Sequence, residues 1–432
     1  MATSRRTFIK NAAQLSALSL LPISSYSNKA TDGKTLEINL KSARVDDESF
    51  WNMLRHQFPL DSHRTYFNNG TMGPSPYPVI EAVYQKMMAV DSTGDYGSSE
   101  ESRKNLAQFV HANEDEICLT HNVTEGINII CWGLNLSKDD EILITNHEHV
   151  GGALPWLSRA KIQGMKVNYF ELGHNAEETL ANLNKKITKK TKVIAVPHVV
   201  CTIGQVQPIK EIVALAKQFN IEVFVDGAHG AGMLNLNLHE LGCDYYASCC
   251  HKWMCGPKGT GFVYIKKEAL DRIQPYFVGA GSDSGWNVVD LPQPSIKGYV
   301  SNAHRYDYGT QNAALWSGVN AAIAFLDGIT MPVIEARVKF LASKLQNDLL
   351  NLKHSNIEML TSTEEKSRAG IIAFRLKNMD YTKFQGEAGI ANFRIRVVPE
   401  NGVNCIRIST HIYNSIEEVT RFVRFVEEMA AK

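Results

Sequence analysis

Short apolar segments alternate with amphipathic helical patterns between residues 116 and 265, and this alternation constrains the fold more than any other feature of the chain. Six of these segments have the length and apolar content of buried strands. They are "EICLT" (Glu116–Thr120), "EILIT" (Glu141–Thr145), "KVIAVPHV" (Lys192–Val199), "IEVFVD" (Ile221–Asp226), "YYASC" (Tyr245–Cys249) and "TGFVYI" (Thr260–Ile265). Between two of them, residues Ile209–Asn220 carry apolar side chains at helical spacing. The pattern predicts an α/β fold with a largely parallel sheet and helices on both faces.

Two charged residues follow predicted strands. Asp226 ends one strand, and Lys252 comes shortly after the strand Tyr245–Cys249. In parallel α/β sheets ligands bind beyond the carboxyl ends of the strands, and Asp and Lys are seldom buried without a partner. One interpretation is a buried ion pair. In the other, Lys252 forms a Schiff base with the aldehyde of pyridoxal phosphate (PLP), and Asp226 keeps the ring nitrogen protonated.

Three further segments agree with a cofactor site, although each has a simpler interpretation. "THNVTEGIN" (Thr120–Asn128) offers backbone N–H groups for a phosphate, or is an ordinary helix cap. His149 in "NHEHVGG" either stacks on a pyridine ring or is a common surface or core histidine. Arg407 lies in the apolar run "NCIRIST" and either binds a substrate carboxylate or forms an internal salt bridge.

The second half of the chain has a different pattern. Long helical patterns follow Val319, and the apolar runs Ile371–Lys377 and Asn404–Thr410 predict a small antiparallel sheet. Ser415 and Glu418 form a capping box at the start of the last helix. We therefore expect an export segment at residues 1–30, a segment at 31–60 that packs with the small domain, a large domain at 61–318 and a small α+β domain at 319–432.

The N-terminus predicts export. "SRRTFIK" (Ser4–Lys10) and the apolar run after it match a twin-arginine signal better than a basic turn before an amphipathic helix. The apolar run is shorter than the roughly 20 residues of a membrane span. We expect a periplasmic or otherwise extracytoplasmic protein without a stable membrane span in its mature form. Formal net charge is +0 with no basic block, so we expect no nucleic-acid partner. The spacing of the eight cysteines suggests no metal site.

Six segments occur in an order that resembles the class V aminotransferases of PLP fold type I, from about Tyr66 to Val426. Within that family the chain is most similar to the isopenicillin N epimerase-like branch. The segments are "FNNGTMGPSP", "NVTEGIN", "NHEHVGG", "DGAHGAG", "HKWMCGPKGTGF", and "RIST" followed by "YNS". The resemblance implies a PLP-dependent transferase fold with a large domain and a smaller C-terminal domain, and a homodimer with shared active sites.

The resemblance also implies roles for matching residues. Lys252 would hold the cofactor and shuttle a proton, and Asp226 would pair with the pyridine nitrogen. His149 would stack on the ring, and His229 would face its phenolate oxygen. The phosphate would be bound by Val123, Thr124, His251 and, from the second subunit, Thr310. The substrate would be bound by Arg407, Asn69 and Gly70.

Three departures bear on the reaction. Cys249 stands where a Ser, Thr or Asn usually helps to bind phosphate, and Cys201 stands where cysteine desulfurases keep an Asn. The segment between Arg396 and Arg407 is short and lacks the mobile cysteine loop of a desulfurase, and Cys405 lies in a predicted strand. On these grounds a desulfurase is not expected.

The function expected from the sequence is therefore an exported PLP enzyme that acts on an amino acid or a small peptide with a free amino group. We expect an epimerase or aminotransferase, hence an isomerase or transferase, with tailoring of siderophore peptides as one context. The alternative is a PLP-dependent β-lyase or desulfurase-like enzyme, and after it a non-catalytic PLP-binding protein. A nucleotide-dependent dehydrogenase is excluded because no G-x-G-x-x-G opens the first β-α unit.

Overall fold

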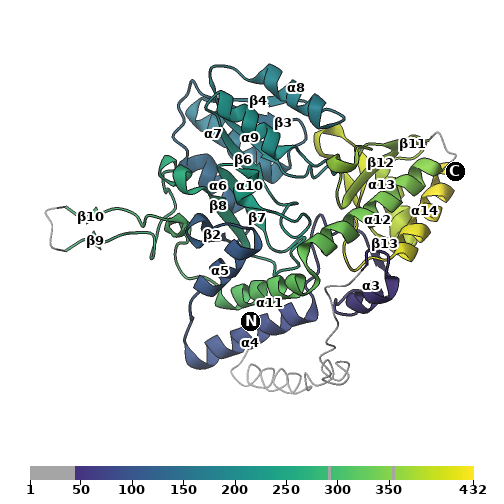
Figure 1. Cartoon of the computed structure of the whole chain (residues 1–432), viewed down its shortest axis with the longest axis horizontal. Helices are drawn as coiled ribbons and strands as arrows, with labels where there is room; N and C mark the ends of the chain where they lie inside the picture. The colour runs from purple at the N-terminus through teal and green to yellow at the C-terminus, as the bar shows by residue number, and fades with distance from the viewer. Residues whose placement is uncertain (1–43, 290–292, 353–355) are drawn as a thin grey trace, which may run out of the picture. The chain divides into compact units, whose positions relative to one another are not determined.

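The computed structural model describes residues 44–289, 293–352 and 356–432. The predicted export signal, with Arg5 and Arg6, lies outside the described residues, as does the first part of the predicted segment 31–60. Within the described part, the two sheets and their covering helices are shown in Figure 1.

A seven-stranded sheet forms the centre of the large domain. Its strands are β2 (Ile117–Thr120), β3 (Glu141–Thr145), β4 (Lys166–Phe170), β5 (Thr191–Pro197), β6 (Glu222–Asp226), β7 (Tyr245–Cys249) and β8 (Gly261–Ile265). Their order is β2-β8-β7-β6-β5-β3-β4, and only β8 runs against its neighbours. Each of the six predicted strands is present, and the largely parallel α/β prediction is confirmed. The sequence did not reveal β4, because most of its side chains are exposed at the sheet edge.

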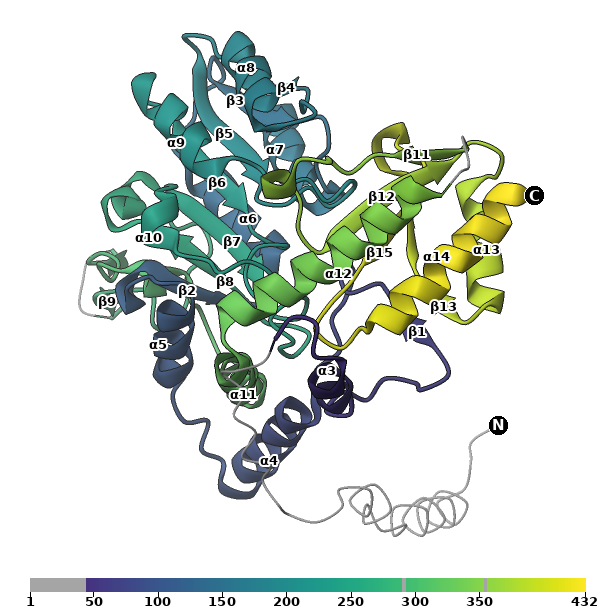
Figure 2. The same ribbon diagram turned by 45° about the vertical axis from the view of Figure 1, so that its right-hand side comes forward.

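Helices cover both faces of this sheet (Figures 1 and 2). They are α5 (Glu100–Phe109), α6 (Val123–Gly133), α7 (Val150–Gln163), α8 (Ala176–Lys186) and α9 (Ile209–Gln218), whereas α4 (Tyr77–Thr93) packs on α11 (Ala313–Ile329) and α10 (Leu238–Leu241) on α9. The approach of α6 to the sheet is close, since a Cβ on Gly126 would lie 2.4 Å from Cγ2 of Val263. Ile127, Trp156 and Phe224 belong to the apolar core between α6, α7 and the sheet. This packing fixes the N-terminus of α6 next to the strand ends.

A second, antiparallel sheet has the order β11-β12-β15-β14. The strands are β11 (Ile357–Met359), β12 (Ile371–Leu376), β14 (Arg396–Val398) and β15 (Cys405–Ser409), with α12 (Met331–Asn351), α13 (Tyr381–Ile390) and α14 (Ile416–Ala431) beside them. The capping box of Ser415 and Glu418 at the start of α14 is present as predicted. Register places Arg396 directly opposite Arg407. The small antiparallel sheet is thus confirmed, and it brings two arginines side by side.

The helix α3 (Glu48–Arg55) contacts the helices beside this second sheet. Glu48 forms an ion pair of 2.5 Å with Arg337 of α12, and Arg55 forms one of 3.1 Å with Glu418 of α14. β1 (Thr65–Tyr66) pairs in parallel with β13 (Phe393–Arg394). The described part of the predicted segment 31–60 therefore lies against α12 and α14.

The helix α11 (Ala313–Ile329) packs on α4 and α5, whereas α12 packs on α14. The two helices meet at Thr330 with a bend of 78° (Figure 2). The boundary predicted at residues 318 and 319 thus falls inside α11. Among the described residues, no single helix has the length and apolar character to cross a membrane, and α11 and α12 meet that test only as a bent pair.

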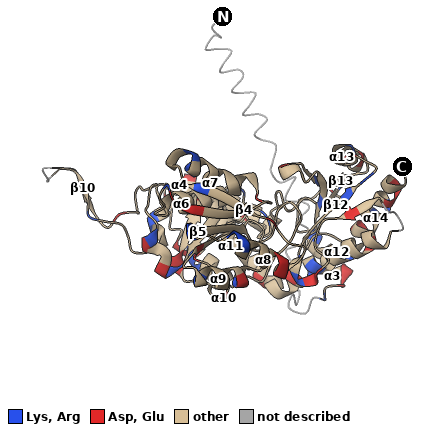
Figure 3. Ribbon diagram, turned by 90° about the horizontal axis from the view of Figure 1, so that it is seen from above, with Lys and Arg blue, Asp and Glu red and all other residues tan. Residues whose placement is uncertain are grey.

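The remaining elements are short. The described residues include the 3-10 helices η2 (Glu114–Glu116), η3 (Lys267–Arg272), η4 (Ala303–Tyr306), η5 (Glu365–Ser367) and η6 (Glu400–Gly402). β9 (Trp286–Asn287) and β10 (Ser295–Ile296) pair antiparallel and project away from the large sheet (Figure 1). Lys, Arg, Asp and Glu are interspersed over the ribbon (Figure 3), in keeping with the even charge balance.

Candidate active site

The carboxyl ends of four strands supply most of the predicted site residues. Thr124 follows β2, His149 follows β3, Asp226 ends β6, and Lys252 follows β7. These four strands run in the same direction, so their ends meet at one edge of the sheet. The edge at which the sequence predicted a ligand is therefore where these side chains gather.

Lys252 and Asp226 do not pair with each other. Lys252 Nζ lies 3.5 Å from Nε2 of His229, and Asp226 Oδ1 accepts a hydrogen bond of 2.9 Å from the Ala228 N–H. In the described part of the chain no ion pair joins the ammonium to the carboxylate. The buried ion pair considered from the sequence is thus not what holds the two residues, and both charges are free to face a third group.

Two glycines keep a space open between these side chains. A Cβ on Gly151 would lie 2.9 Å from Thr124 Oγ1 and 3.2 Å from His149 Nδ1. A Cβ on Gly152 would lie 3.3 Å from Asp226 Oδ2. His149 is the N-cap of α7, and its Nδ1 accepts a hydrogen bond of 3.0 Å from the Gly151 N–H. The "HVGG" sequence therefore both orients the imidazole and leaves room beside it.

The N-terminus of α6 and His251 are the two groups expected to bind the phosphate. Asn122 caps α6 by accepting from the Glu125 N–H, and Val123 and Thr124 are the first helical residues. Nδ1 of His251 is buried without a hydrogen-bond partner. Burial, together with the charges of Lys252 and Lys258, lowers the pKa of His251 to about 4, so the ring is neutral. A buried nitrogen without a partner and the free N–H groups at a helix N-terminus are each suited to bind a phosphate.

The space and its donor set fit PLP. If PLP binds here, Asp226 would be available to the ring nitrogen, His149 to the ring face, His229 to the phenolate oxygen and Lys252 to the aldehyde. The structure also shows what Cys249, which departs from the residue usual in the family, contacts. Its thiol is buried and lies 3.9 Å from the carbonyl of Ala228, so it does not replace the hydroxyl or amide expected at that position.

Thr310 stands apart from the other predicted residues. It is exposed in the loop between η4 and α11, and it lines a hollow of about 360 Å³ with residues 96–99. The phosphate contact assigned to Thr310 was expected from a second subunit, and that assignment stays a prediction.

Arg407 lies at the predicted substrate side. The side chain is fully buried; Nη1 donates to the Cys201 carbonyl at 2.8 Å and Nη2 to Thr71 Oγ1 at 2.9 Å. Nε has no partner, and no carboxylate of the described residues forms an ion pair with the guanidinium. Burial, with Arg396 adding to it, lowers the pKa of Arg407 to about 10. A buried cation without a counter-charge is suited to an anionic ligand.

Asn69 and Gly70 lie beside this arginine. A Cβ on Gly70 would lie 3.3 Å from Nη2 of Arg407, so glycine permits the close approach. Oδ1 of Asn69 accepts a hydrogen bond of 2.9 Å from the Tyr413 hydroxyl, and its Nδ2 is buried without a partner. The three residues predicted to bind substrate are thus brought together, with a free N–H on two of them.

Sequence reasoning missed three residues of this site, each adjacent to a predicted one. Thr71 follows Gly70 and holds Arg407, and Trp253 follows Lys252 and donates to His229 at 3.0 Å. Glu148 precedes His149; its Oε1 accepts from the Thr145 N–H and hydroxyl at 3.1 and 2.7 Å. Burial, with a contribution from Asp226, raises the pKa of Glu148 to about 8. Adjacency in sequence was the only signal for the three.

All eight cysteines are free, buried thiols. Burial raises the pKa of each, to about 11 for Cys201 and to about 12 for Cys405. Cys405 lies in β15 with its thiol toward the Thr202 carbonyl at 3.8 Å. None of the thiols is thus both accessible and easily ionised.

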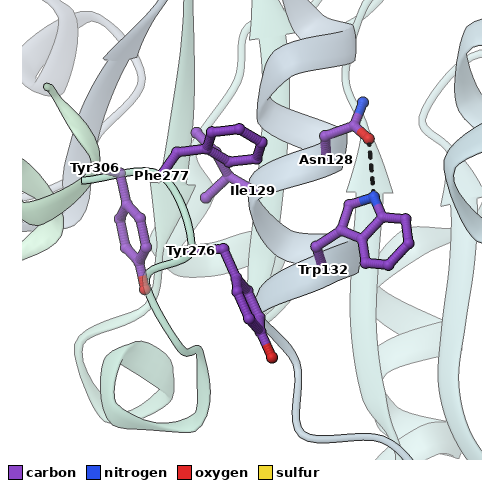
Figure 4. Close-up of a pocket in the computed structure, with 6 residues that line it drawn as sticks. All are labelled: Asn128, Ile129, Trp132, Tyr276, Phe277 and Tyr306. Carbon is purple, nitrogen blue, oxygen red and sulfur yellow. Dashed lines mark hydrogen bonds between the residues drawn. The ribbon is translucent and has the colours of Figure 1, made fainter. Parts of the chain in front are cut away.

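A separate aromatic hollow lies on the outer side of α6 (Figure 4). Trp132 donates to Asn128 Oδ1 at 3.2 Å, and Tyr276 and Phe277 face them. Its lining, which also includes Ile129 and Tyr306, contains none of the predicted site residues. The described residues also contain no cluster of three or more His, Cys, Asp or Glu side chains placed to hold a metal ion.

The chain matches the family model described as aminotransferase class-V over residues 86–422. A protein of Pyrococcus abyssi named probable cysteine desulfurase is 30% identical over 398 residues, which cover 87% of this chain and 96% of that protein. A probable cysteine desulfurase of Methanothermobacter thermautotrophicus is 26% identical and covers 87% of this chain and 97% of its own length.

Solved structures are similar over the same span. A mutant of C-DES with glycine covalently linked to its PLP cofactor has a TM-score of 0.79 and 26% identity, covering 87% of this chain and 99% of that chain. The cystine C–S lyase C-DES in complex with its reaction product cysteine persulfide has a TM-score of 0.78 and 26% identity, with coverage of 86% and 99%. The apo cysteine desulfurase of Thermococcus onnurineus has a TM-score of 0.78 and 27% identity, with coverage of 90% and 99%.

These comparisons correct the function expected from the sequence. The relatives and neighbours named above are cysteine desulfurases or a C–S lyase. The main expectation of an epimerase or aminotransferase, an isomerase or transferase, is therefore wrong, and the β-lyase or desulfurase-like alternative is favoured. None of these matches supports the epimerase-like branch. The reason is that the shared motifs bind a cofactor common to all these reactions and do not choose among them.

The cofactor and fold predictions are confirmed at the level of the family. The structural neighbours have the PLP fold type I architecture, and one of them carries PLP linked to glycine. The family match covers well over half of the chain, and the Pyrococcus protein matches nearly all of it. The chain belongs to the class V aminotransferase family, whose members depend on PLP.

Proposed function

We propose that the protein is a PLP-dependent C–S lyase that acts on a sulfur-containing amino acid of the cysteine or cystine type. The proposal is supported by the desulfurases and the cystine C–S lyase among its relatives and neighbours. When bound, PLP supplies an electron sink for bonds broken at the α-carbon of the substrate. The roles of the protein's own residues follow from their positions.

Arg407 binds the substrate carboxylate, because its buried guanidinium has no counter-charge and its Nε has no partner. Asn69 has a buried Nδ2 to offer to the same ligand. Lys252 Nζ takes and returns the α-proton, since it faces the space bordered by His149 and Asp226. Asp226 holds a proton on the ring nitrogen of the cofactor. Fixing the carboxylate and the proton acceptor together orients the bond that has to break.

The observation that carries the proposal furthest is the state of the cysteines. A thiol that takes sulfur from a substrate must be accessible and must ionise. All eight thiols are buried, and burial raises the pKa of each of them. We therefore propose direct β-elimination, in which the sulfur leaves the substrate with its own substituent and is not transferred to the protein. A disulfide amino acid such as cystine suits this reaction, because a persulfide is a better leaving group than hydrosulfide.

The test is the product spectrum of the purified, PLP-loaded protein. We expect pyruvate and a persulfide detectable by cyanolysis from cystine, and much slower release of sulfide from cysteine. Alanine and glutamate serve as substrates for transamination and as controls. Production of alanine and protein-bound sulfur from cysteine would contradict direct elimination.

Cysteine desulfurase is the second candidate, favoured by the names of the curated relatives. Cys201 is the thiol to test, because its own carbonyl accepts from Arg407 at the substrate side. If the protein is a desulfurase that uses this thiol, Cys201→Ser abolishes sulfur release from cysteine. Under our proposal the same variant keeps its activity on cystine.

We further propose a homodimer with shared active sites. Helix α4 carries an exposed apolar stripe at helical spacing, formed by Tyr77, Ile80, Tyr84, Met87 and Met88. Such a stripe on a helix is suited to burial against a second chain. We expect a dimer by light scattering, and a weaker PLP affinity in Thr310→Ala. A monomeric wild type that binds PLP tightly would contradict this arrangement.

A further inference from the structure

The indole of Trp253 is built into the site from both sides. Trp253 is fully buried, and its Nε1 donates a hydrogen bond of 3.0 Å to Nδ1 of His229. Its ring stacks on His411 with centroids 5.5 Å apart and 24° between the planes. A Cβ on Gly370 would lie 2.8 Å from the Trp253 ring, so the indole has little freedom to move.

We propose that Trp253 is a positioning residue that fixes the neutral ring of His229 in its Nε2–H tautomer. In this tautomer the Nε2–H of His229 is the donor that would face the phenolate oxygen of PLP. An indole N–H is only a donor, so the imidazole nitrogen that it contacts must be the unprotonated one. In a neutral ring the proton is then on Nε2, which lies 3.5 Å from Lys252 Nζ.

The charge state of His229 agrees with this arrangement. Burial lowers the pKa of His229 well below its usual value, and the cations Lys252, Arg407 and Arg396 and the ring of His149 act in the same direction. Asp226, the carboxylate at the end of β6, binds the Ala228 N–H and forms no ion pair with His229. Burial and the neighbouring cations therefore all disfavour a second proton on the His229 ring.

A second histidine holds Trp253 in the same way. His411 Nδ1 accepts from the Ile412 N–H at 2.8 Å, so its proton is on Nε2, which lies 3.1 Å from the Trp253 carbonyl. His411 also stacks on Tyr413, whose hydroxyl donates to Asn69. The stack Trp253–His411–Tyr413 thus links His229, on the cofactor side, to Asn69, on the substrate side.

The first test needs no substrate and is read on the wild-type protein, with one variant used only to assign the signal. In cofactor-free protein labelled with ¹⁵N-histidine, the His229 signal is assigned by its loss in His229→Gln. We expect an unprotonated Nδ1 and a protonated Nε2 from pH 6 to pH 9. An Nδ1–H tautomer, or a ring that gains a proton near pH 6.5, would overturn the proposal.

The second test uses Trp253→Phe, which keeps an aromatic ring but loses the N–H. The matched control is Trp51→Phe, because Trp51 is also buried and donates its N–H to the Arg44 carbonyl at 3.0 Å, away from the site. A donor to the phenolate oxygen favours deprotonation of the lysine-bound cofactor. Weakening one hydrogen bond should therefore raise the pH at which its visible band titrates by about 0.5 to 1 pH unit.

The control should titrate as the wild type does. An unchanged titration in Trp253→Phe would overturn the positioning role. The inference rests on PLP binding at Lys252 but not on the substrate, and neither test contains a sulfur compound. A failure of the proposed lyase activity would therefore leave both results interpretable.

Discussion

Replacing Arg407 by lysine separates carboxylate recognition from a structural role. The guanidinium uses Nη1 for the Cys201 carbonyl and Nη2 for Thr71, and it keeps Nε free. A lysine ammonium at this position is a single point of charge and cannot satisfy these two acceptors and also hold a carboxylate. The substrate then loses at least one charge-assisted hydrogen bond, worth about 1.5–3 kcal/mol. That loss corresponds to an increase in KM of about 10- to 150-fold.

The assay is steady-state kinetics with a carboxylate substrate and with its amide, together with the cofactor spectrum. Arg337→Lys is the matched control. Arg337 is also fully buried, but it has an ion pair of 2.5 Å with Glu48 and donates to the Val45 and Asn414 carbonyls. We expect Arg337→Lys to lower the melting temperature and leave KM unchanged. The reasoning is refuted if Arg407→Lys shows that same result, or if the wild type binds amino acid and amide equally.

Three further predictions follow from buried carboxyl chemistry, backbone strain and the N-terminus. Burial raises the pKa of Glu148 to about 8, so the folded state keeps a proton that the unfolded state loses near pH 4.5. The stability of the wild type therefore falls as pH rises between these two values. In urea unfolding, Glu148→Gln should be more stable than the wild type by about 1 kcal/mol or more at pH 9, and equal to it at pH 4. Thr330 has φ 83° and ψ 140°, a region that favours glycine. Thr330→Gly should therefore increase the free energy of unfolding by about 1 kcal/mol while Thr330→Ala does not; a decrease in Thr330→Gly would exclude strain at this position. Export is proposed from the sequence alone: a reporter fused to residues 1–35 should remain in the cytoplasm when Arg5 and Arg6 both become lysine, and efficient export of that variant would refute the twin-arginine assignment.

The large sheet could be predicted because its information is local. Each strand from β2 to β8, except the exposed edge strand β4, is a short apolar run, and the rule that ligands lie beyond strand carboxyl ends placed Asp226 and Lys252 at one edge. The direction of each strand, in contrast, could not be predicted from its local sequence. β8 runs antiparallel because the chain turns back after Lys252, and its apolar pattern is the same in either direction.

The contacts that define the substrate side could not be predicted. Arg407 is held by Thr71 and by the carbonyl of Cys201, which are distant in sequence and meet only through the packing of the two sheets. The tautomer of His229 likewise depends on Trp253, whose place beside it is a tertiary contact. The reaction was predicted wrongly because the motifs concern the cofactor and the substrate carboxylate, which these reactions share, and the fate of the substrate depends on groups outside those motifs.

The central claim is that sulfur leaves the substrate without passing through a protein thiol. The most direct measurement is the rate of pyruvate and persulfide formation from cystine by a variant in which Cys201, Cys249 and Cys405 are all replaced by serine or alanine. These are the cysteines at the substrate side, beside Lys252 and in β15. We predict a kcat within about threefold of the wild type, since a change of less than 1 kcal/mol accompanies loss of thiols with no chemical role. A folded, PLP-loaded variant that no longer releases sulfur would contradict the claim.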